Sequence, residues 1–487
     1  MILQTNTTII FEQSKENRTG FKLPNNKIDK YKIDKIIDKK YLRKAIPRLP
    51  EVSESQVVRH FSNLSIKNHH VDKNFYPLGS CTMKYNPKIN DSIAMLDAFS
   101  QIHPSQNEAS IQGILKVYYE LGKFLCEITG MDDVTLQPSA GSQGELVGLL
   151  LMKKYHEVEN NKTKKYVIIP KTAHGTNPAS VIMSGYKVKQ VNSDSRGRVC
   201  LEHLSELIDD ETAGMMLTQP NTLGLFEDNI EKISSMIHSV DGLMYMDGAN
   251  LNALVGMVNP SKMGFDITHI NLHKTFSTPH GGGGPGAGPV AVNQKLSTYL
   301  PTPTVILDDS GYHIKSLPQS IGKVHSFMGN YGVLLRAYVY ILCLGKKGLR
   351  NVSRMAVLNA NYLKHLLIEN YNIPFSDGTM HEFVISAENQ KKQGFKALDI
   401  AKNLLDFGFH APTVYFPTNI PESIMIEPTE TETKETLDSF AEAMKYLDEN
   451  IQLKLDYFKE APYHTPVRRL NEAKANRELD INWKYEI

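Results

Sequence analysis

The chain has 487 residues, more than one small core needs, so two domains with an additional arm are expected. Hydrophobic residues make up 41% and charged residues 22%, as in ordinary globular proteins, and the formal net charge of +1 gives no reason to expect nucleic acid or an anionic membrane as a partner. No apolar run approaches about 18 residues and the start lacks a signal-peptide pattern, so we expect no membrane span and a cytoplasmic location. The four cysteines are scattered without CxxC spacing, which argues against a zinc site or a disulfide framework.

The first part of the chain, residues 1 to about 60, is polar and Lys-rich and has little periodicity. We interpret it as an extended arm or short helices lying on another surface, such as a partner subunit; a loose tail is the alternative. Residues 75–84 follow as a loop rich in Pro, Gly and small hydroxyl residues, a composition that often lines binding sites.

Two helices are predicted next. Residues 112–129 show apolar residues at helical spacing, and Gly130 ends the pattern. Residues 138–144 form a small-residue loop that leads into a helix from Glu145 to about Tyr155. Free backbone N–H groups and the helix dipole would make the start of this helix a phosphate cradle, and a tight capped turn is the alternative. It is not a P-loop, because the Gly-Lys-Ser/Thr ending is absent.

Strands and helices then alternate, which predicts a doubly wound, mostly parallel sheet. Polar residues follow several strands, and ligands of such sheets bind at the carboxyl ends of the strands. We therefore expect His174, Asn221, Asp247 and Lys274 to converge on one edge. The predicted strands are residues 166–170, 215–218, 243–247, 267–272 and 288–292.

The last third of the chain is predicted to be a smaller α+β domain. Helices are expected at residues 356–369 and 397–407 and a strand at residues 382–385. Thr429 is predicted to cap a final helix with Glu432 at its third position. The apolar face of that helix would be Leu437, Phe440, Met444 and Leu447. The predicted parts are an arm at 1–75, a large domain at 76–345, a small domain at 346–460 and a tail at 461–487.

Lys274 lies at the end of a predicted strand, just before the glycine run at residues 281–284. A lysine kept deprotonated can form a Schiff base with a carbonyl cofactor, although an ordinary surface lysine is the alternative. An aldehyde cofactor with a pyridine ring and a phosphate also needs a carboxylate for its ring nitrogen, a flat group to stack on the ring and a helix start for the phosphate. Asp247 could supply the carboxylate, His174 the flat group and the loop at Gly141 the helix start, and each lies at a suitable place in the predicted topology.

The sequence and order of these motifs resemble those of fold-type I pyridoxal-phosphate enzymes and, more narrowly, those of the glycine decarboxylase P-protein of the glycine cleavage system. The length is similar to the second subunit of the two-subunit form of that family. The resemblance implies a mostly parallel seven-stranded sheet flanked by helices, with a smaller α+β domain and an N-terminal arm. The matching stretches are residues 77–84, 143–145, 173–180, 247–250, 271–276, 279–286 and 427–430.

The resemblance also implies roles for individual residues. Lys274 would carry pyridoxal 5'-phosphate, Asp247 would pair with the ring nitrogen, and His174 would stack on the ring and take part in catalysis. The phosphate would meet Gly141, Ser142 and Gln143. The remaining residues expected to bind the cofactor are Ala249, Asn221 and Thr222. No metal is expected.

The implied activity is that of glycine dehydrogenase (aminomethyl-transferring). Glycine loses CO2, and its aminomethyl group passes to the lipoyl arm of H-protein. The implied partners are a first subunit, lipoylated H-protein and glycine, in a heterotetramer with two copies of each subunit. We interpret the loop at residues 278–288 as one wall of the channel for the lipoyl arm.

Several assignments stay open at this point. The candidates for proton transfer or for guiding the sulfur are His273, His280, Thr275 and Cys81, and Arg336 is available for the glycine carboxylate. Another fold-type I enzyme acting on glycine or serine is an alternative function. A non-catalytic scaffold subunit with the same fold is a second alternative.

Overall fold

The computed structural model describes residues 8–22, 24, 33–45, 47–159, 164–280 and 286–483. The chain divides into two compact units. Residues 1–70 and 462–487 form the first, here called the arm–tail unit, and residues 71–461 form the second, here called the main unit. The domain boundaries expected at residues 75, 345 and 460 remain predictions.

The arm–tail unit is built from short helices and one longer helix. The N-terminus of α1 is held by a capping box, in which Ser53 and Gln56 satisfy each other's backbone N–H groups. The rings of Phe11 and Trp483 stack with centroids 5.9 Å apart, so the two ends of the chain meet within this unit. Its helices are η1 (Ile33–Lys35), η2 (Lys39–Tyr41), α1 (Glu54–Lys67) and α15 (Glu472–Arg477).

A seven-stranded sheet lies at the centre of the main unit, in the order β1-β7-β6-β5-β4-β2-β3. Neighbouring strands from β6 to β3 are parallel, whereas β7 is antiparallel to both β6 and β1. The predicted mostly parallel sheet is confirmed, but β1 and β3 were not predicted. The strands are β1 (Asp133–Thr135), β2 (Tyr166–Pro170), β3 (Lys187–Val191), β4 (Thr212–Thr218), β5 (Leu243–Gly248), β6 (Ile267–Ile270) and β7 (Val290–Val292).

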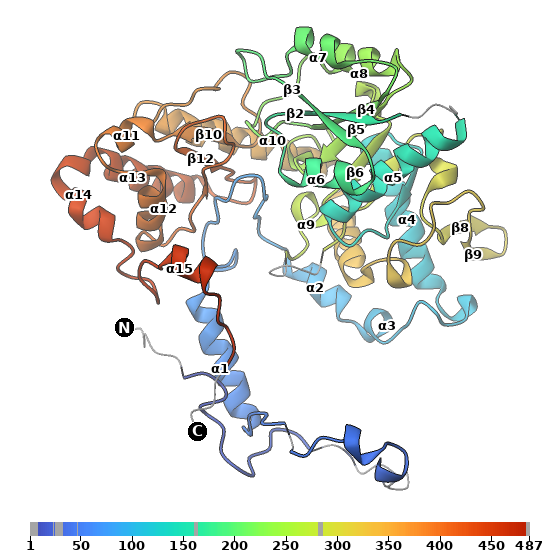
Figure 1. The fold of residues 1–487 in the computed structure, drawn as a ribbon, viewed down its shortest axis with the longest axis horizontal. Coiled ribbons are helices and arrows are strands. Elements are labelled where there is room, and N and C mark those ends of the chain that lie inside the picture. Colours follow the sequence, from blue (N-terminus) through green and yellow to red (C-terminus); the bar gives the residue numbers. More distant parts are fainter. Residues whose placement is uncertain are drawn as a thin grey trace. The chain divides into compact units, whose positions relative to one another are not determined.

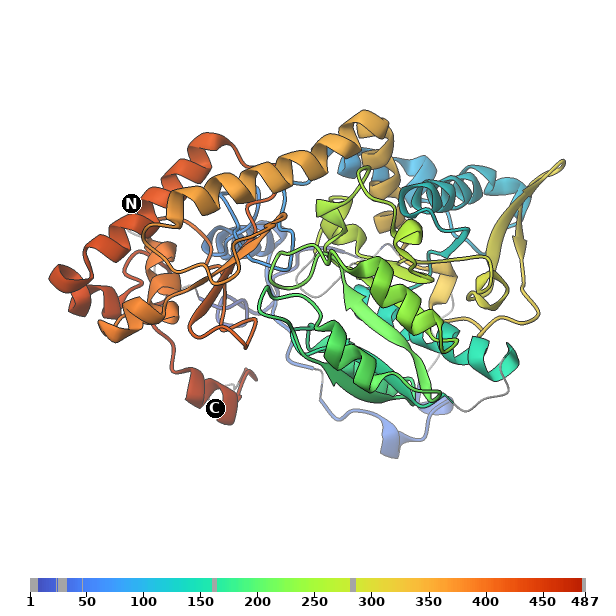
Figure 2. The same ribbon diagram turned by 90° about the horizontal axis from the view of Figure 1, so that it is seen from above.

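Helices cover both faces of this sheet (Figures 1 and 2). Met244 and Met246 of β5 belong to the core that also contains buried residues of α4, α8 and α10. Leu243 and Tyr245 point to the other face, into a core shared with α5 and α6. This alternation is the expected period of two for a strand buried on both sides. The helices are α4 (Gln112–Thr129), α5 (Gly141–Glu159), α6 (Thr176–Met183), α7 (Leu201–Leu207), α8 (Ile230–His238) and α10 (Tyr331–Leu367).

A smaller antiparallel sheet, in the order β10-β12-β11, packs with the C-terminal helices of the main unit. The predicted apolar face of the last long helix is confirmed, because Leu437, Phe440, Met444 and Leu447 are all buried there. The elements are β10 (Phe383–Ser386), β11 (Thr413–Val414), β12 (Ser423–Ile426), α11 (Glu388–Lys392), α12 (Ala397–Asp406), α13 (Lys434–Glu449) and α14 (Ile451–Glu460).

The remaining elements of the main unit are short connections and one hairpin. They are α2 (Lys88–Ala94), α3 (Asp97–Ser100), η3 (Glu108–Ser110), η4 (Leu251–Ala253), η5 (Pro260–Met263), α9 (Leu272–Thr275), η6 (Ser297–Tyr299), η7 (Ser326–Met328) and the hairpin of β8 (Thr304–Asp308) and β9 (Gly311–Lys315).

The starts of three helices differ from the prediction, and the first is the helix expected at residues 356–369, which is part of α10 and begins at Tyr331. The helix expected from Glu145 begins at Gly141, because the small residues of the loop form its first turn. The predicted cap at Thr429 is wrong: α13 is capped by Thr433, whose side chain accepts from the Thr436 N–H. Thr429 instead has a φ of 59° and is buried, which takes it out of any helical turn.

Among the described residues, one helical stretch at residues 326–367 is long and apolar enough to pass a simple test for a membrane span. It consists of η7 and α10, and α10 is interrupted at Gly345, where φ is 58°. Leu334, Leu335 and Ala337 of α10 are almost fully buried within the protein. Packing in the core therefore accounts for part of the apolar composition of α10.

Candidate functional site

A cavity of about 240 Å³ opens at the carboxyl ends of the central strands. Three of the four residues predicted to converge there, His174, Asp247 and Lys274, line it. The other lining residues are Ser80, Ala140, Gly141, Ser142, Glu145, Thr176, Thr218, Thr222, Ala249, Asn250, His269, Asn271 and His273. These three residues thus meet at the edge of the sheet where ligands of open α/β sheets bind.

Lys274 lies in the one-turn helix α9 and not on the strand, because β6 already ends at Ile270. The Asn271 carbonyl accepts from the Lys274 N–H at 3.0 Å and closes this turn. Lys274 Nζ donates to the Ser80 carbonyl at 2.7 Å. A second lysine stabilises the end of α9, since Lys84 Nζ donates to the Thr275 carbonyl at 2.7 Å. The amine is therefore placed at the cavity by α9 and by the loop that contains Ser80.

Asp247 is the second-last residue of β5 and is buried with three polar nitrogen atoms around its carboxylate. Oδ1 accepts from the Ala249 N–H at 2.9 Å and lies 3.3 Å from His269 Nε2, and Oδ2 accepts from Asn177 Nδ2 at 3.0 Å. Burial alone would raise the pKa of Asp247, but His269 and the Asn177 hydrogen bond outweigh it and leave the pKa below its usual value. The carboxylate stays ionised, as a partner for a protonated ring nitrogen must.

The first turn of α5 faces the same cavity with small residues. A side chain on Gly141 would have its Cβ 2.2 Å from Asn271 Oδ1, so only glycine fits there. Gly141 and Ser142 line the cavity, and the first N–H groups of a helix have no partners within the helix. This start of α5 is a suitable place for a phosphate group.

Two residues predicted to bind the cofactor do not line the cavity with their side chains. Gln143 accepts from the Ser139 N–H at 2.7 Å and donates to the Val324 carbonyl at 2.9 Å. Asn221 donates to the Gly197 carbonyl at 3.0 Å and accepts from the Leu223 N–H at 2.9 Å. Their side chains brace neighbouring loops, so any direct contact of Gln143 with a phosphate is left to its backbone.

His174 and Thr222 line the cavity as expected. His174 Nδ1 lies 2.9 Å from Thr176 Oγ1, and its ring meets the Phe416 ring edge-on at 5.9 Å. Desolvation lowers the pKa of His174, and the opposing pull of Asp247 does not cancel this, so the ring is neutral. Thr222 Oγ1 donates to the Thr172 carbonyl at 2.6 Å.

The candidates for proton transfer differ in their position. His273 lines the cavity and its Nδ1 is buried without a hydrogen-bond partner. Its ring contacts that of His280 at 5.1 Å, and His280 Nε2 donates to the Cys81 carbonyl at 3.1 Å. Desolvation and neighbouring positive groups lower the pKa of His273 to about 3 and that of His280 to about 4. Both rings are therefore neutral near pH 7.

Burial raises the pKa of the Cys81 thiol, against a smaller opposing effect of Lys274. The Thr275 hydroxyl is buried without a hydrogen-bond partner. Arg336 lies outside the cavity, in α10, and its Nε donates to Asp91 Oδ1 at 2.6 Å. An arginine engaged in this ion pair is not placed to bind a glycine carboxylate beside Lys274.

Two buried glutamates, whose role was not predicted, hold the loop beside Lys274. Glu382 Oε2 accepts from the Ser80 N–H at 2.7 Å, and Glu427 Oε2 accepts from the Thr82 N–H at 2.9 Å. Ser80 and Thr82 have φ values of 63° and 43°, a conformation that costs free energy for residues other than glycine. The glutamates stabilise this strained loop from positions more than 300 residues away along the chain.

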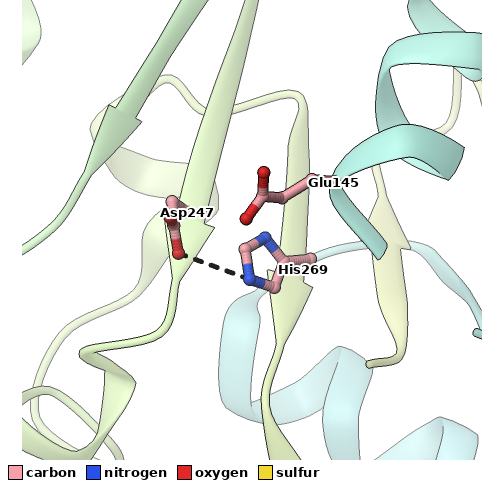
Figure 3. A group of neighbouring side chains, drawn as sticks. All are labelled: Glu145, Asp247 and His269. Atoms are coloured by element: carbon pink, nitrogen blue, oxygen red, sulfur yellow. Dashed lines mark ion pairs between the residues drawn. The ribbon is translucent and has the colours of Figure 1, made fainter. Parts of the chain in front are cut away.

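Glu145 and His269 were also missed as lining residues. They lie next to Asp247, on α5 and β6 (Figure 3). Desolvation and the nearby Asp247 raise the pKa of Glu145 to about 7, although Thr176 and Ser180 donate to its two oxygens at 2.7 and 2.9 Å. The alternation along β6 could have pointed to His269, because its neighbours in the strand are apolar or Thr.

Comparison with family models and curated proteins identifies the chain's relatives. Residues 17–310 match the model for the glycine cleavage system P-protein, and residues 352–462 match that for the C-terminal domain of glycine dehydrogenase. A protein from Caldanaerobacter subterraneus subsp. tengcongensis named "Probable glycine dehydrogenase (decarboxylating) subunit 2" is 51% identical, with 99% of this chain and 100% of the relative covered. One from Shouchella clausii with the same name is also 51% identical and covers 98% of this chain and 97% of the relative.

Solved structures share the fold. A glycine decarboxylase (P-protein) of the glycine cleavage system in inhibitor-bound form superposes with a TM-score of 0.73 at 21% identity, over 85% of this chain and 94% of that one. A glutamate decarboxylase from Lactobacillus brevis gives a TM-score of 0.64 at 13% identity, over 89% and 96%. The architecture is thus that of fold-type I enzymes.

Proposed function

This chain belongs to the glycine cleavage system P-protein family, and we propose that it decarboxylates glycine and transfers the aminomethyl group to the lipoyl arm of H-protein, with pyridoxal 5'-phosphate as its cofactor. The observation that carries the proposal is Lys274, whose amine lies in one cavity with the ionised Asp247, with His174 and with the start of α5. Neither alternative, a different glycine or serine enzyme or a scaffold subunit, has a comparable observation in its favour.

The residues of the cavity fit this cofactor. Asn271 Oδ1 and His273 Nδ1 are buried without hydrogen-bond partners, so polar groups are available for a ligand. Lys274 would hold the aldehyde carbon, Asp247 would pair with the ring nitrogen, and Gly141 and Ser142 would receive the phosphate. Bound in this way, pyridoxal phosphate supplies an electron sink for the carbanion that remains when glycine loses CO2.

The protein's own residues then have defined tasks. Lys274 would hold the cofactor, and the Ser80 carbonyl, which accepts from Lys274 Nζ, orients this amine. The cavity must orient glycine so that its Cα–carboxylate bond is perpendicular to the ring. His273 is the favoured group for moving a proton at the reacting carbon or sulfur, because among the candidates it lines the cavity with a ring nitrogen unpartnered.

The partners follow from the family. The relatives are named as subunit 2, so a first subunit is expected, and we propose a heterotetramer with two copies of each chain in the cytoplasm. Lipoylated H-protein would deliver its arm to the cavity. The glycine run at residues 281–284, predicted to form a wall for that arm, lies outside the described residues, so this role stays a prediction.

The test is Lys274→Ala in the complex with the first subunit, assayed by glycine–bicarbonate exchange with lipoylated H-protein. We expect a loss of about three orders of magnitude or more, because the variant has no amine to bind the aldehyde. The exposed Lys262→Ala is the matched control and should be unaffected. Retained exchange by Lys274→Ala would refute the proposal, and tetrahydrofolate-dependent serine formation by the wild type would favour the alternative enzyme.

A further inference from the structure

Two buried side chains lie in a row behind Asp247, and the nearer one, His269, also lines the cavity. Asp247 and His269 face each other on the neighbouring parallel strands β5 and β6, with Asp247 Oδ1 3.3 Å from His269 Nε2 (Figure 3). On the other side of the imidazole, Tyr245 OH lies 2.9 Å from His269 Nδ1. Tyr245 and His269 are at most 1% exposed, so water does not compete for these contacts.

The direction of these hydrogen bonds can be assigned. Burial raises the pKa of Tyr245 well above 10, so the phenol keeps its proton. Burial also lowers the pKa of His269, so the ring is neutral and carries one proton. If Nδ1 held that proton, the Nε2 lone pair would face the Asp247 carboxylate, an unfavourable arrangement. Tyr245 therefore donates to Nδ1, and the Nε2–H group faces Asp247 Oδ1, with the two heavy atoms 3.3 Å apart.

Helix α5 is shaped to accommodate this pair. A Cβ at Gly148 would lie 2.2 Å from the Tyr245 ring, and a Cβ at Gly144 would lie 3.1 Å from His269 Cβ. These glycines are one helical turn apart and lie on one face of the helix that begins at the cavity. The close approach of α5 leaves little room for either ring to move.

We propose that Tyr245 and His269 are positioning residues that fix the charge and orientation of Asp247, and so determine how firmly the site keeps a proton on the ring nitrogen of its cofactor. This inference rests on the proposed function. Oδ1 of Asp247 accepts from the Ala249 N–H and lies 3.3 Å from His269 Nε2, and Oδ2 accepts from Asn177 Nδ2. Without His269, the buried carboxylate loses the polar group that lies 3.3 Å from its Oδ1.

A metal ion is the competing occupant of this cluster. Glu145, Asp247 and His269 each offer one ligand atom, and the three atoms lie within 4.8 Å of one another. Protein donors already use these groups, however: Thr176 and Ser180 donate to Glu145, and Tyr245 occupies the second nitrogen of His269. The cluster is satisfied without an ion, which favours the positioning role.

The test is His269→Leu and His269→Gln in the complex with the first subunit, with pyridoxal phosphate affinity and the pH titration of cofactor absorbance as readouts. We expect His269→Leu to bind the cofactor about tenfold more weakly and to shift the titration midpoint by about one pH unit, the size of effect expected when a buried charged group loses a polar partner. His269→Gln still presents an N–H group to Asp247, so it should recover most of the cofactor affinity and most of the original titration midpoint. Glu145, Lys274 and His174 also face Asp247 and are unchanged in these variants.

The matched control is His238→Leu. His238 Nε2 lies 2.8 Å from Asp266 Oδ2 in a similar His–Asp pair that does not line the cavity, so its loss should leave the absorbance titration unchanged. An unchanged titration and affinity in folded His269→Leu would overturn the inference. So would a stoichiometric metal ion in the wild type that His269→Leu loses. A wild type without bound cofactor would overturn the proposed function and this inference together.

Discussion

Lys84 is a buried ammonium group whose partners come from four parts of the main unit. Its Nζ donates to Asn252 at 2.8 Å, to the Thr275 carbonyl at 2.7 Å and to Glu430 at 2.7 Å, and lies 3.2 Å from Tyr340 OH. Burial would lower the pKa of Lys84, but Glu430 and Tyr340 raise it, so the charge is retained. This network anchors the helix that contains Lys274.

Lys84→Met should therefore destabilise the protein strongly. Removing one partner leaves Glu430 buried without its counter-charge, which typically costs about 3–5 kcal/mol in the free energy of unfolding. Denaturant unfolding measures the loss, and the double variant with Glu430→Gln should recover part of it. The exposed pair Lys88–Asp72 is the comparison, since Lys88→Met should cost at most about 1 kcal/mol. Equal losses at the two lysines would contradict the role assigned to Lys84.

The buried glutamates beside Ser80 predict a pH dependence of stability. Desolvation and mutual repulsion raise the pKa of Glu382 to about 8, and desolvation raises that of Glu427 to about 7, from the usual 4.5. Between the usual pKa of 4.5 and these raised values, the two glutamates are ionised in the unfolded chain but keep their protons in the folded chain. The free energy of unfolding should thus be highest, for these groups, below about 4.5 and fall as pH rises to about 8.

Glu382→Gln should make this decline shallower, because the variant has no proton to retain. The range from pH 6.5 to 8 is the one to measure, by thermal unfolding of the protein without cofactor. Below pH 6.5, the lowered pKa values of His273, His280 and His381 make the free energy of unfolding rise with pH, which opposes the effect of the glutamates. Glu388→Gln, at an exposed position in α11, is the control, and an identical slope in Glu382→Gln and wild type would count against the proposed protonation.

At the level of elements, glycines in two helices have different roles. A Cβ at Gly148 of α5 would overlap the Tyr245 ring, whereas a Cβ at the exposed Gly113 of α4 meets nothing within 4 Å. Gly148→Ala should cost about 1–3 kcal/mol through overpacking, despite the better helix propensity of alanine. Gly113→Ala should be neutral or stabilise by up to about 1 kcal/mol. Guanidinium unfolding of both variants checks this, and a harmless Gly148→Ala would mean that α5 can move away from the sheet.

The elements that sequence predicted best are those with a strong local pattern. The α4 helix was predicted at its observed bounds because its apolar spacing ends at Gly130, which has a φ of 73°. The β3 strand was missed because its sequence, KVKQV, lies at the sheet edge and is mostly not buried. The cap of α13 was misplaced because both Thr429 and Thr433 are suitable capping residues, and only tertiary contacts distinguish them.

At the scale of the whole molecule, the predicted strand topology alone was enough to predict that residues following different buried strands lie close together. His174, Asp247 and Lys274 were placed in one cavity on this basis. The second layer of the site was not predictable in this way, because Ser80 and Glu382 are 302 residues apart and Thr82 and Glu427 are 345 apart. Such pairs depend on how the small sheet packs in the main unit, for which no local pattern exists.

Because the chain contains a separate arm–tail unit, we predict that the complete chain does not unfold in a single transition. Among its described residues only Val52, His60 and Pro462 are buried, too few for a core comparable with that of the main unit. The only tryptophan of the chain, Trp483, is stacked on Phe11 within this unit. Its fluorescence therefore reports on the arm–tail unit, whereas far-ultraviolet circular dichroism is dominated by the helices of the main unit.

We expect the fluorescence transition of the isolated chain to occur at a lower denaturant concentration than the circular-dichroism transition, because two units of unequal burial need not unfold together. Trp483→Phe should abolish the fluorescence signal and leave the circular-dichroism transition in place, which assigns the early step to this unit. Addition of the first subunit provides a further test: if that subunit binds the folded arm–tail unit, it stabilises it by mass action and moves the fluorescence transition toward the other. Coincident transitions in the isolated chain would show that the arm–tail unit is as stable as the main unit.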